Sequence, residues 1–212
     1  MESNLQSQRI GQSSTLLLRE ARREDWPALA EIHLAVLPEA LTTRLGREYA
    51  FSVFYPIATA HPHTLTILAQ EESCVKGFVM FAKTPHTFKH LLAQRRLPLL
   101  YAMMRHPGAF FFLLRSLFET LTPPRICWLE EPPTNTIHFF LMGVEPKSRN
   151  RGIAKAMLEE GLATAKSRFG ANSCLVQTHT ELAARFHLLN GFRVIGTEKR
   201  DGKVFTVLLR DL

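Results

Sequence analysis

The chain has 212 residues and a formal net charge of +7, with 46% hydrophobic and 21% charged residues, which is typical of a soluble globular protein. This length fits one domain, or one domain with an insertion. Three cysteines, an odd number without a CxxC pair, argue against a disulfide framework or a zinc site. We therefore expect a reduced, cytoplasmic protein without a metal, and the basic charge suits an anionic partner of undefined kind.

The first part of the chain predicts a leader, a strand, two helices and a hairpin. Residues 1–14 lack the apolar core of a secretory signal, so we expect a flexible leader before a single domain at 15–212. A strand at 15–19 precedes a helix for which Asp25 is a suitable N-cap and Pro38 the end. A second helical stretch is expected at about 44–57, and a hairpin of strands at 64–70 and 75–83.

Residues 84–125 predict a helical insertion that is both basic and apolar. From Lys83 to Arg125 there are seven Lys and Arg residues and a single acid, Glu119, so most of the excess positive charge lies here. The runs at 97–104 and 110–114 are strongly apolar. Such a segment suits a helical cap packed on the sheet, a lid over an anionic acceptor, a homodimer interface or a peripheral contact with an anionic membrane.

The second part of the chain alternates strands and helices. The segment TIHFFLMGV at 136–144 predicts a buried strand, and a helix follows at about 151–168 with Gly170 as its C-terminal stop. A strand is expected at 173–177 and a helix at 180–189. The chain closes with a hairpin of strands at 192–197 and 204–209 about Asp201 and Gly202.

The loop between the strand at 136–144 and the next helix has the properties of an anion site. Free backbone N–H groups and the partial positive charge at a helix N-terminus bind phosphates well. Gly152 allows a ligand to approach closely, because it has no side chain. The loop has neither the Gly-Lys-Ser/Thr ending of a P-loop nor a GxGxxG pattern. A basic, solvated helix start remains the alternative interpretation.

The segment FFLMGVEPKSRNRGIAKAMLEEGL resembles the GCN5-related N-acetyltransferase (GNAT) superfamily. That family carries [Gln/Arg]-x-x-Gly-x-[Gly/Ala] in this setting, and Arg149, Gly152 and Ala154 fill the three fixed places. With the layout of the insertion, the chain also loosely resembles a bacterial branch linked to amino-sugar and surface-polysaccharide pathways. The resemblance to the superfamily is strong over 136–212.

A second match to the same family occupies residues 180–192. The family pattern there is Asn-x-x-Ala-x-x-Phe-Tyr followed by Gly-Phe. Thr180 stands where Asn is usual, and His187 stands where Tyr is usual. Four other positions agree with the pattern: Ala183, Phe186, Gly191 and Phe192.

The resemblance implies an α/β (α+β) fold, in which a mixed central sheet is flanked by helices and splayed between the strands at 136–144 and 173–177. It implies that acetyl-CoA is the co-substrate and that the strand at 136–144 splays after Val144. The backbone of Met142 and Val144 would then meet the pantetheine arm, and the amide near Met142 would serve the oxyanion. The other cofactor-binding residues implied are Arg149, Asn150, Arg151, Gly152, Ile153 and Ala154 of the loop, with Thr180 and Phe186.

Two histidines are the candidate catalytic residues. In the resembling family a Tyr at the position of His187 commonly serves the leaving thiolate, and an imidazolium or a neutral ring N–H could do so here. His138 in the buried strand could accept the proton of the amine. Strict alternation would place His138 on the face of Phe140, Met142 and Val144. A helix-surface histidine and a core histidine are the respective alternatives.

The resemblance implies an N-acetyltransferase that acts on the primary amine of a small molecule, possible acceptors being an amino sugar or a nucleotide-linked amino sugar. Glu130 and Glu131, just before the strand at 136–144, are candidate substrate anchors, with a solvated loop as the alternative. A non-catalytic acyl-CoA sensor and a peripheral membrane protein acting through the insertion remain rival functions. No nucleic-acid-binding motif is present in the sequence.

Overall fold

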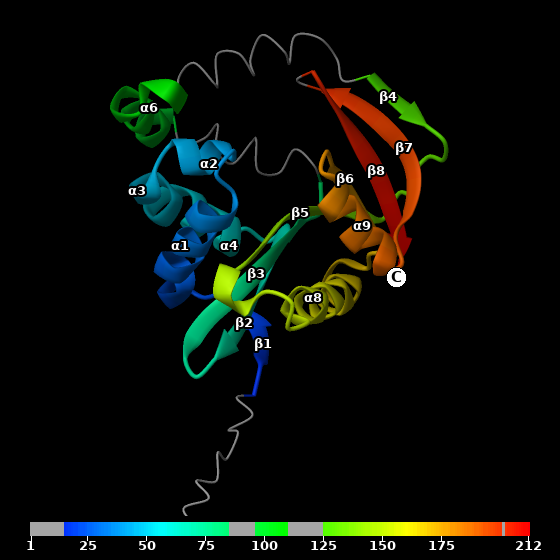
Figure 1. The fold of residues 1–212 in the computed structure, drawn as a ribbon, viewed down its shortest axis with the longest axis horizontal. Helices are drawn as coiled ribbons and strands as arrows, with labels where there is room; N and C mark the ends of the chain where they lie inside the picture. Colours follow the sequence, from blue (N-terminus) through cyan, green and yellow to red (C-terminus); the bar gives the residue numbers. More distant parts are fainter. Residues whose placement is uncertain (1–14, 85–95, 110–124, 201) are drawn as a thin grey trace, which may run out of the picture.

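The computed structural model describes residues 15–84, 96–109, 125–200 and 202–212. Within these ranges eight strands form one sheet, in the order β1-β2-β3-β5-β6-β8-β7-β4, which confirms the expected mixed α/β fold (Figure 1). The strands are β1 (Leu17–Glu20), β2 (Thr64–Glu71), β3 (Cys74–Ala82), β4 (Arg125–Trp128), β5 (Thr136–Val144), β6 (Ser173–Thr178), β7 (Arg193–Arg200) and β8 (Lys203–Asp211).

Helices cover both faces of the sheet. Helices α1 to α4 lie on one side of β2, β3 and β5, and α8 lies on the other side (Figure 1). The helical elements are η1 (Arg23–Asp25), α1 (Trp26–Val36), α2 (Leu41–Arg44), α3 (Arg47–Tyr49), η2 (Ala50–Phe54), α4 (Tyr55–Ala60), α6 (Arg96–Arg105), η3 (Pro146–Ser148), α8 (Ile153–Phe169) and α9 (Glu181–Leu189).

Strand β3 separates two apolar cores because successive side chains point to opposite faces. Phe78 and Met80 join the core under α1 and α4, which we call the α1-side core. Val79 and Phe81 join the core under α8, which we call the α8-side core. Gly161 lets α8 approach the sheet closely, since a Cβ at this position would lie 2.3 Å from Phe81 Cε2.

Strands β5 and β6 are parallel neighbours only near their starts. Their pairing runs from Thr136 opposite Ser173 to His138 opposite Leu175 and then stops. Beyond this point β5 continues beside β3 as far as Val144, and β6 continues beside β8. We call the two unpaired edges beyond His138 and Leu175 the splay. The sequence predicted this divergence, but its expected start after Val144 was wrong, because the pairing ends six residues earlier.

A β-bulge in β5 changes which face its side chains meet. Met80 lies opposite Leu141 and Phe81 opposite Phe139, so Phe140 is an extra residue in β5. Phe139 and Met142 consequently both face the α8-side core. His138 lies opposite Ala82, a residue of the α1-side core. The expectation that His138 shares a face with Met142 and Val144 was therefore wrong.

Two other predicted elements differ in the structure. The helical stretch expected at about 44–57 is divided, because Gly46 has a φ of +89° between α2 and α3, and η2 is a π-helix. Strand β4 was missed: Arg125, the expected end of the insertion, starts this edge strand, which pairs with β7. The remaining strands and helices agree with the expected ones within a few residues at each end.

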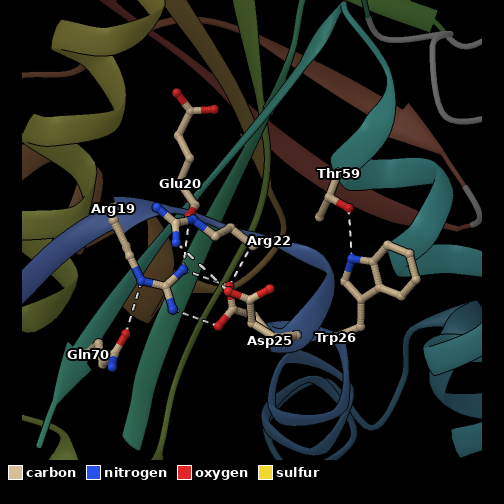
Figure 2. A network of polar contacts seen from close by, with 8 residues as sticks. Arg19, Glu20, Arg22, Asp25, Trp26, Thr59 and Gln70 are labelled. Atoms are coloured by element: carbon tan, nitrogen blue, oxygen red, sulfur yellow. Dashed lines mark hydrogen bonds and ion pairs between the residues drawn. The ribbon is translucent and has the colours of Figure 1, made fainter. Parts of the chain in front are cut away.

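Asp25 is the N-cap residue of α1, as predicted, and its side chain anchors the start of the helix without bonding to an amide of α1. Arg19 donates two hydrogen bonds to the Asp25 carboxylate, at 2.7 and 2.8 Å, and the backbone N–H of Arg22 donates a third at 2.7 Å (Figure 2). Burial alone would raise the pKa of Asp25, but these hydrogen bonds lower it below its ordinary value. Nearby, the indole of Trp26 donates to Thr59 at 2.9 Å and joins α1 to α4.

Helix α6 makes up most of the described part of the predicted insertion. Its inner side packs on the α1-side core through Leu99, Ala102 and Met103. The predicted leader at 1–14, the rest of the insertion at 85–95 and 110–124, and Asp201 of the hairpin turn lie outside the described residues. In the described segments, every helix is too short or too polar to cross a bilayer. The outer side of α6 exposes Leu97, Leu100, Tyr101 and Met104.

Candidate active site

The loop after β5 turns sharply into α8. Asn150 has a φ of +61° and Gly152 a φ of +78°, both in the left-handed region that favours glycine. A Cβ built on Gly152 would meet no atom within 4 Å, so the space in front of this residue is open. The glycine is therefore required by the backbone conformation and leaves room for a ligand.

The N-terminus of α8 offers free hydrogen-bond donors. Gly152 is the N-cap residue, and no side chain caps the helix. The carbonyl of Gly152 accepts the first helical hydrogen bond, from Ala156 at 3.0 Å. The amides of Ile153, Ala154 and Lys155 precede this bond and have no partner within the helix. The first turn holds no acidic residue, so it can accept an anion without charge repulsion.

The two arginines of the loop have different roles. Arg151 donates two hydrogen bonds to Glu71 at the end of β2, at 2.7 and 3.0 Å, and the Glu71 side chain is only 9% exposed. Arg151 therefore fastens the loop to the β2–β3 hairpin, and its charge is balanced by a carboxylate. Arg149 is exposed and forms no ion pair with another described residue. It is the arginine whose charge is free for a ligand.

His187 of α9 is buried among aromatic rings. Its imidazole lies edge-to-face with Phe139 and Phe192, each at 4.9 Å between ring centroids, and with Phe186 at 5.2 Å. Burial lowers the pKa of His187 to about 4, so the ring is neutral near pH 7. Its Nδ1 is buried and has no hydrogen-bond partner. The side chain can act as a neutral donor or acceptor but not as a standing imidazolium.

The two candidate histidines lie near the start of the splay, on opposite faces of the sheet. His138 is in the last residue pair between β5 and β6 and faces the α1 side. His187 contacts the next residue of β5, Phe139, from the α8 side. The two histidines, 49 positions apart in the sequence, are thus brought to adjacent residues of β5.

The remaining residues expected at the cofactor lie along the same region. Met142 and Val144 belong to the edge of β5 that no longer pairs with β6. Thr180 is the N-cap of α9, and its hydroxyl accepts a hydrogen bond from the amide of Ala183 at 3.4 Å. Phe186 is partly buried in the α8-side core. Thr180 and Phe186 thus have clear packing and capping roles in the folded chain.

The structure does not bring Glu130 to the splay. Both Glu130 carboxylate oxygens accept hydrogen bonds from Arg193, at 2.7 and 3.3 Å. Arg193 also pairs with Asp211, which lies opposite Ser173 at the start of β6. Glu130 is therefore held at the end of the sheet away from the splay. Glu131 is exposed in the connection between β4 and β5.

Sequence reasoning missed three residues that meet beside the splay. Lys203 Nζ at the start of β8 lies 3.1 Å from Glu39 Oε2 in the α1–α2 connection. The same ammonium lies 3.4 Å from His179 Nε2, directly after β6. Glu39 and Lys203 are separated by 164 positions, so no local sequence signal could have paired them. Among the described residues, no group of His, Cys, Asp and Glu could hold a metal ion.

Sequence comparison identifies one family for most of the chain. A sequence-family model described as the acetyltransferase (GNAT) family matches residues 26–192. This range includes the loop before α8, both candidate histidines and the α1–α2 connection. A search of the curated proteins finds no match.

Solved structures share the fold at low sequence identity. A GNAT-family acetyltransferase from Desulfovibrio desulfuricans matches with a TM-score of 0.60 and 12% identity, over 93% of this chain and 99% of that one. The yncA protein of Salmonella typhimurium, solved with its cofactor acetyl-CoA, gives 0.59 and 14% over 94% and 95%. The PaiA N-acetyltransferase of Thermoplasma acidophilum, solved with coenzyme A, gives 0.54 and 15% over 93% and 99%. These similarities establish the common architecture.

Proposed function

Because this chain belongs to the acetyltransferase (GNAT) family, we propose that it transfers the acetyl group of acetyl-CoA to a primary amine of a small molecule. The observation that carries this proposal is the uncapped N-terminus of α8 beside the splay. It combines free amides, an open space before Gly152 and the unpaired charge of Arg149. Helix N-termini of this kind bind phosphate groups, and acetyl-CoA carries a pyrophosphate.

In this proposal acetyl-CoA lies across the end of β5. The pyrophosphate accepts hydrogen bonds from the amides of residues 150–154, while the pantetheine arm enters the splay along Met142 and Val144. An unpaired strand edge suits this arm, because the arm carries amide groups that need hydrogen-bond partners. Two proteins with the same fold were solved with acetyl-CoA or coenzyme A, which supports the choice of ligand.

The chemistry assigned to this chain follows from the two histidines. Acetyl transfer forms a C–N bond to the amine, breaks the C–S bond and requires a donor for the oxyanion, for which we propose the amide near Met142. His187, held neutral by burial, donates a ring N–H toward the sulfur as the thiolate leaves. His138 accepts the proton of the amine from the α1 side, directly or through water. Thr180 and Phe186 shape the cofactor side of the splay.

The acceptor class is a finer proposal. An amino sugar, free or nucleotide-linked, would suit the strongly basic chain, because a nucleotide diphosphate is anionic.

The exposed apolar side chains of α6 offer a surface for a homodimer or for a peripheral membrane contact. A cytoplasmic location fits the need for acetyl-CoA and for reduced cysteines.

Calorimetric titration with acetyl-CoA tests the proposal. We expect binding that weakens at least about tenfold in Gly152→Glu, because a carboxylate there opposes the pyrophosphate and the left-handed backbone is strained. Gly170→Glu is a matched control: it has a φ of +64° and an open surrounding at the other end of the same helix. Equal losses in both variants, or no binding by the wild type, would refute the proposal. Binding without turnover of any amine would favour the acyl-CoA sensor.

A further inference from the structure

Three segments converge on the α1 side of the splay, at its open end. Val36 at the end of α1 lies against Gly143 near the end of β5, since a Cβ on Gly143 would be 2.9 Å from Val36 Cγ2. Glu39 follows three residues later. His179 directly follows the end of β6, and Lys203 begins the strand beside it. The contact between Glu39 and Lys203 therefore connects the two strand ends that the splay separates.

Lys203 places a primary ammonium between two acceptors. Its Nζ donates to the Glu39 carboxylate at 3.1 Å and to His179 Nε2 at 3.4 Å. The His179 ring is tilted against Phe205 at 5.1 Å, which steadies the imidazole. Arg200 lies over the same Phe205 ring at 4.4 Å and is engaged by Glu198 at 3.5 Å. A carboxylate and an imidazole acceptor around one ammonium are the groups that a protonated amine requires.

This contact is easily opened. The side chain of Glu39 is 72% exposed and that of Lys203 is 49% exposed. Ion pairs between such exposed side chains contribute little to stability, because water competes and both side chains lose freedom. The hydrogen bond from Lys203 lowers the pKa of Glu39, so the carboxylate stays charged and ready for another cation. An ammonium brought by a ligand can therefore replace that of Lys203.

We propose that Glu39 and His179 bind the ammonium group of the acceptor amine as it enters the splay, before His138 takes its proton, and that Lys203 occupies their site as an internal competitor until the acceptor displaces it. This proposal rests on the acetyltransferase function proposed above and narrows its acceptor to a cationic primary amine. A hydroxyl acceptor has no charge with which to displace Lys203. In the absence of the acceptor, the ion pair between Lys203 and Glu39 bridges the α1 side of the splay.

The test is a steady-state assay of acetyl transfer to glucosamine, tyramine and ethanolamine, with kcat and KM determined separately. In Lys203→Met we expect the KM of the accepted amine to fall about two- to fivefold, because the competitor is absent. In Glu39→Gln we expect KM to rise about tenfold with a smaller change in kcat, and Glu39→Asp should recover part of this loss. Lys199→Met, which removes an exposed charge from β7, is the matched control and should leave KM unchanged.

A double variant separates competition from a structural effect. If Lys203 acts only through Glu39, Lys203→Met should have no effect on KM in the Glu39→Gln background. An unchanged or raised KM in Lys203→Met would overturn the proposal, as would a KM that Glu39→Gln leaves unaltered. Failure of the Lys203→Met protein to acetylate any of the three amines would overturn it as well.

Acetyl-CoA titration of the same proteins keeps the two proposals distinguishable. All variants should bind acetyl-CoA as the wild type does, because the side chains of Glu39 and Lys203 bond to each other and to His179, whereas the loop before α8 is fastened to Glu71. Normal cofactor binding with unaltered amine kinetics would refute the ammonium site alone. Loss of acetyl-CoA binding in the wild type would instead refute the acetyltransferase function.

Discussion

The buried state of His187 makes protein stability depend on pH in a predictable direction. The pKa of this histidine falls to about 4 in the folded chain because burial disfavours the charged ring. In the unfolded chain it returns to about 6.5. The unfolded state therefore takes up a proton first as the pH falls. The contribution of His187 is fully present above pH 6.5 and is lost as the pH falls toward 4.

The magnitude follows from the difference in proton affinity. A tenfold change in proton affinity corresponds to about 1.4 kcal/mol. Between pH 7 and pH 5, His187 should therefore cost the folded state about 2 kcal/mol. His33 is equally buried, has its pKa lowered to about 4 for the same reason, and should contribute a similar loss. Aspartates and glutamates with lowered pKa values remain charged over this interval and add little.

The variant His187→Phe should remove half of this pH dependence. A phenyl ring can keep the edge-to-face contacts with Phe139 and Phe192 but cannot take up a proton. The free energy of unfolding, measured with urea at pH 7 and pH 5, should fall by about 2 kcal/mol less than in the wild type. Ala184→Gly in the same helix is the control: it should lower stability by about 1 kcal/mol at both pH values. If His187→Phe kept the full pH dependence of the wild type, the ring would not be held neutral as described.

Three further variants test the contacts that position the site. Gly161→Ala should lower the free energy of unfolding by about 2 kcal/mol in urea, because its methyl group would overlap Phe81; no destabilisation would mean that α8 can move away. Asp25→Asn should cost about 2 kcal/mol in the same assay by weakening the partly buried hydrogen bonds from Arg19, and an isoenergetic variant would contradict this. Glu71→Gln should weaken acetyl-CoA binding a few-fold, because Arg151 no longer fixes the loop, and unaltered calorimetric affinity would show that the loop needs no such fastening.

Local sequence signals predicted most of the element order. Alternating and helical patterns located β5, α8 and α9, and the spacing of Arg149 and Gly152 located the loop between them. These features depend on neighbouring residues, which a single sequence displays directly. The open N-terminus of α8 was predictable for the same reason. Gly152 indicates the turn, and it has no side chain that could block a ligand.

Features that depend on pairing between distant segments were not predictable. The end of the β5–β6 pairing at His138 and the strand β4 depend on partners far along the chain. The burial of His187 depends on Phe139, which comes from a different strand. The ion pair between Glu71 and Arg151 joins residues 80 positions apart. In each case the partner is determined by tertiary contacts, which can override the secondary-structure preference of the local sequence.

The extra residue in β5 gives one strand two independent surfaces. Before Phe140 the inward and outward positions follow one phase, and after it they follow the opposite phase. Removing Phe140 would restore a single alternation and exchange the faces on one side of it relative to the other. A residue before Phe140 and a residue an even number of positions later, on the other side of the bulge, therefore reach opposite faces of the sheet, so substitutions at two such positions do not meet in one core.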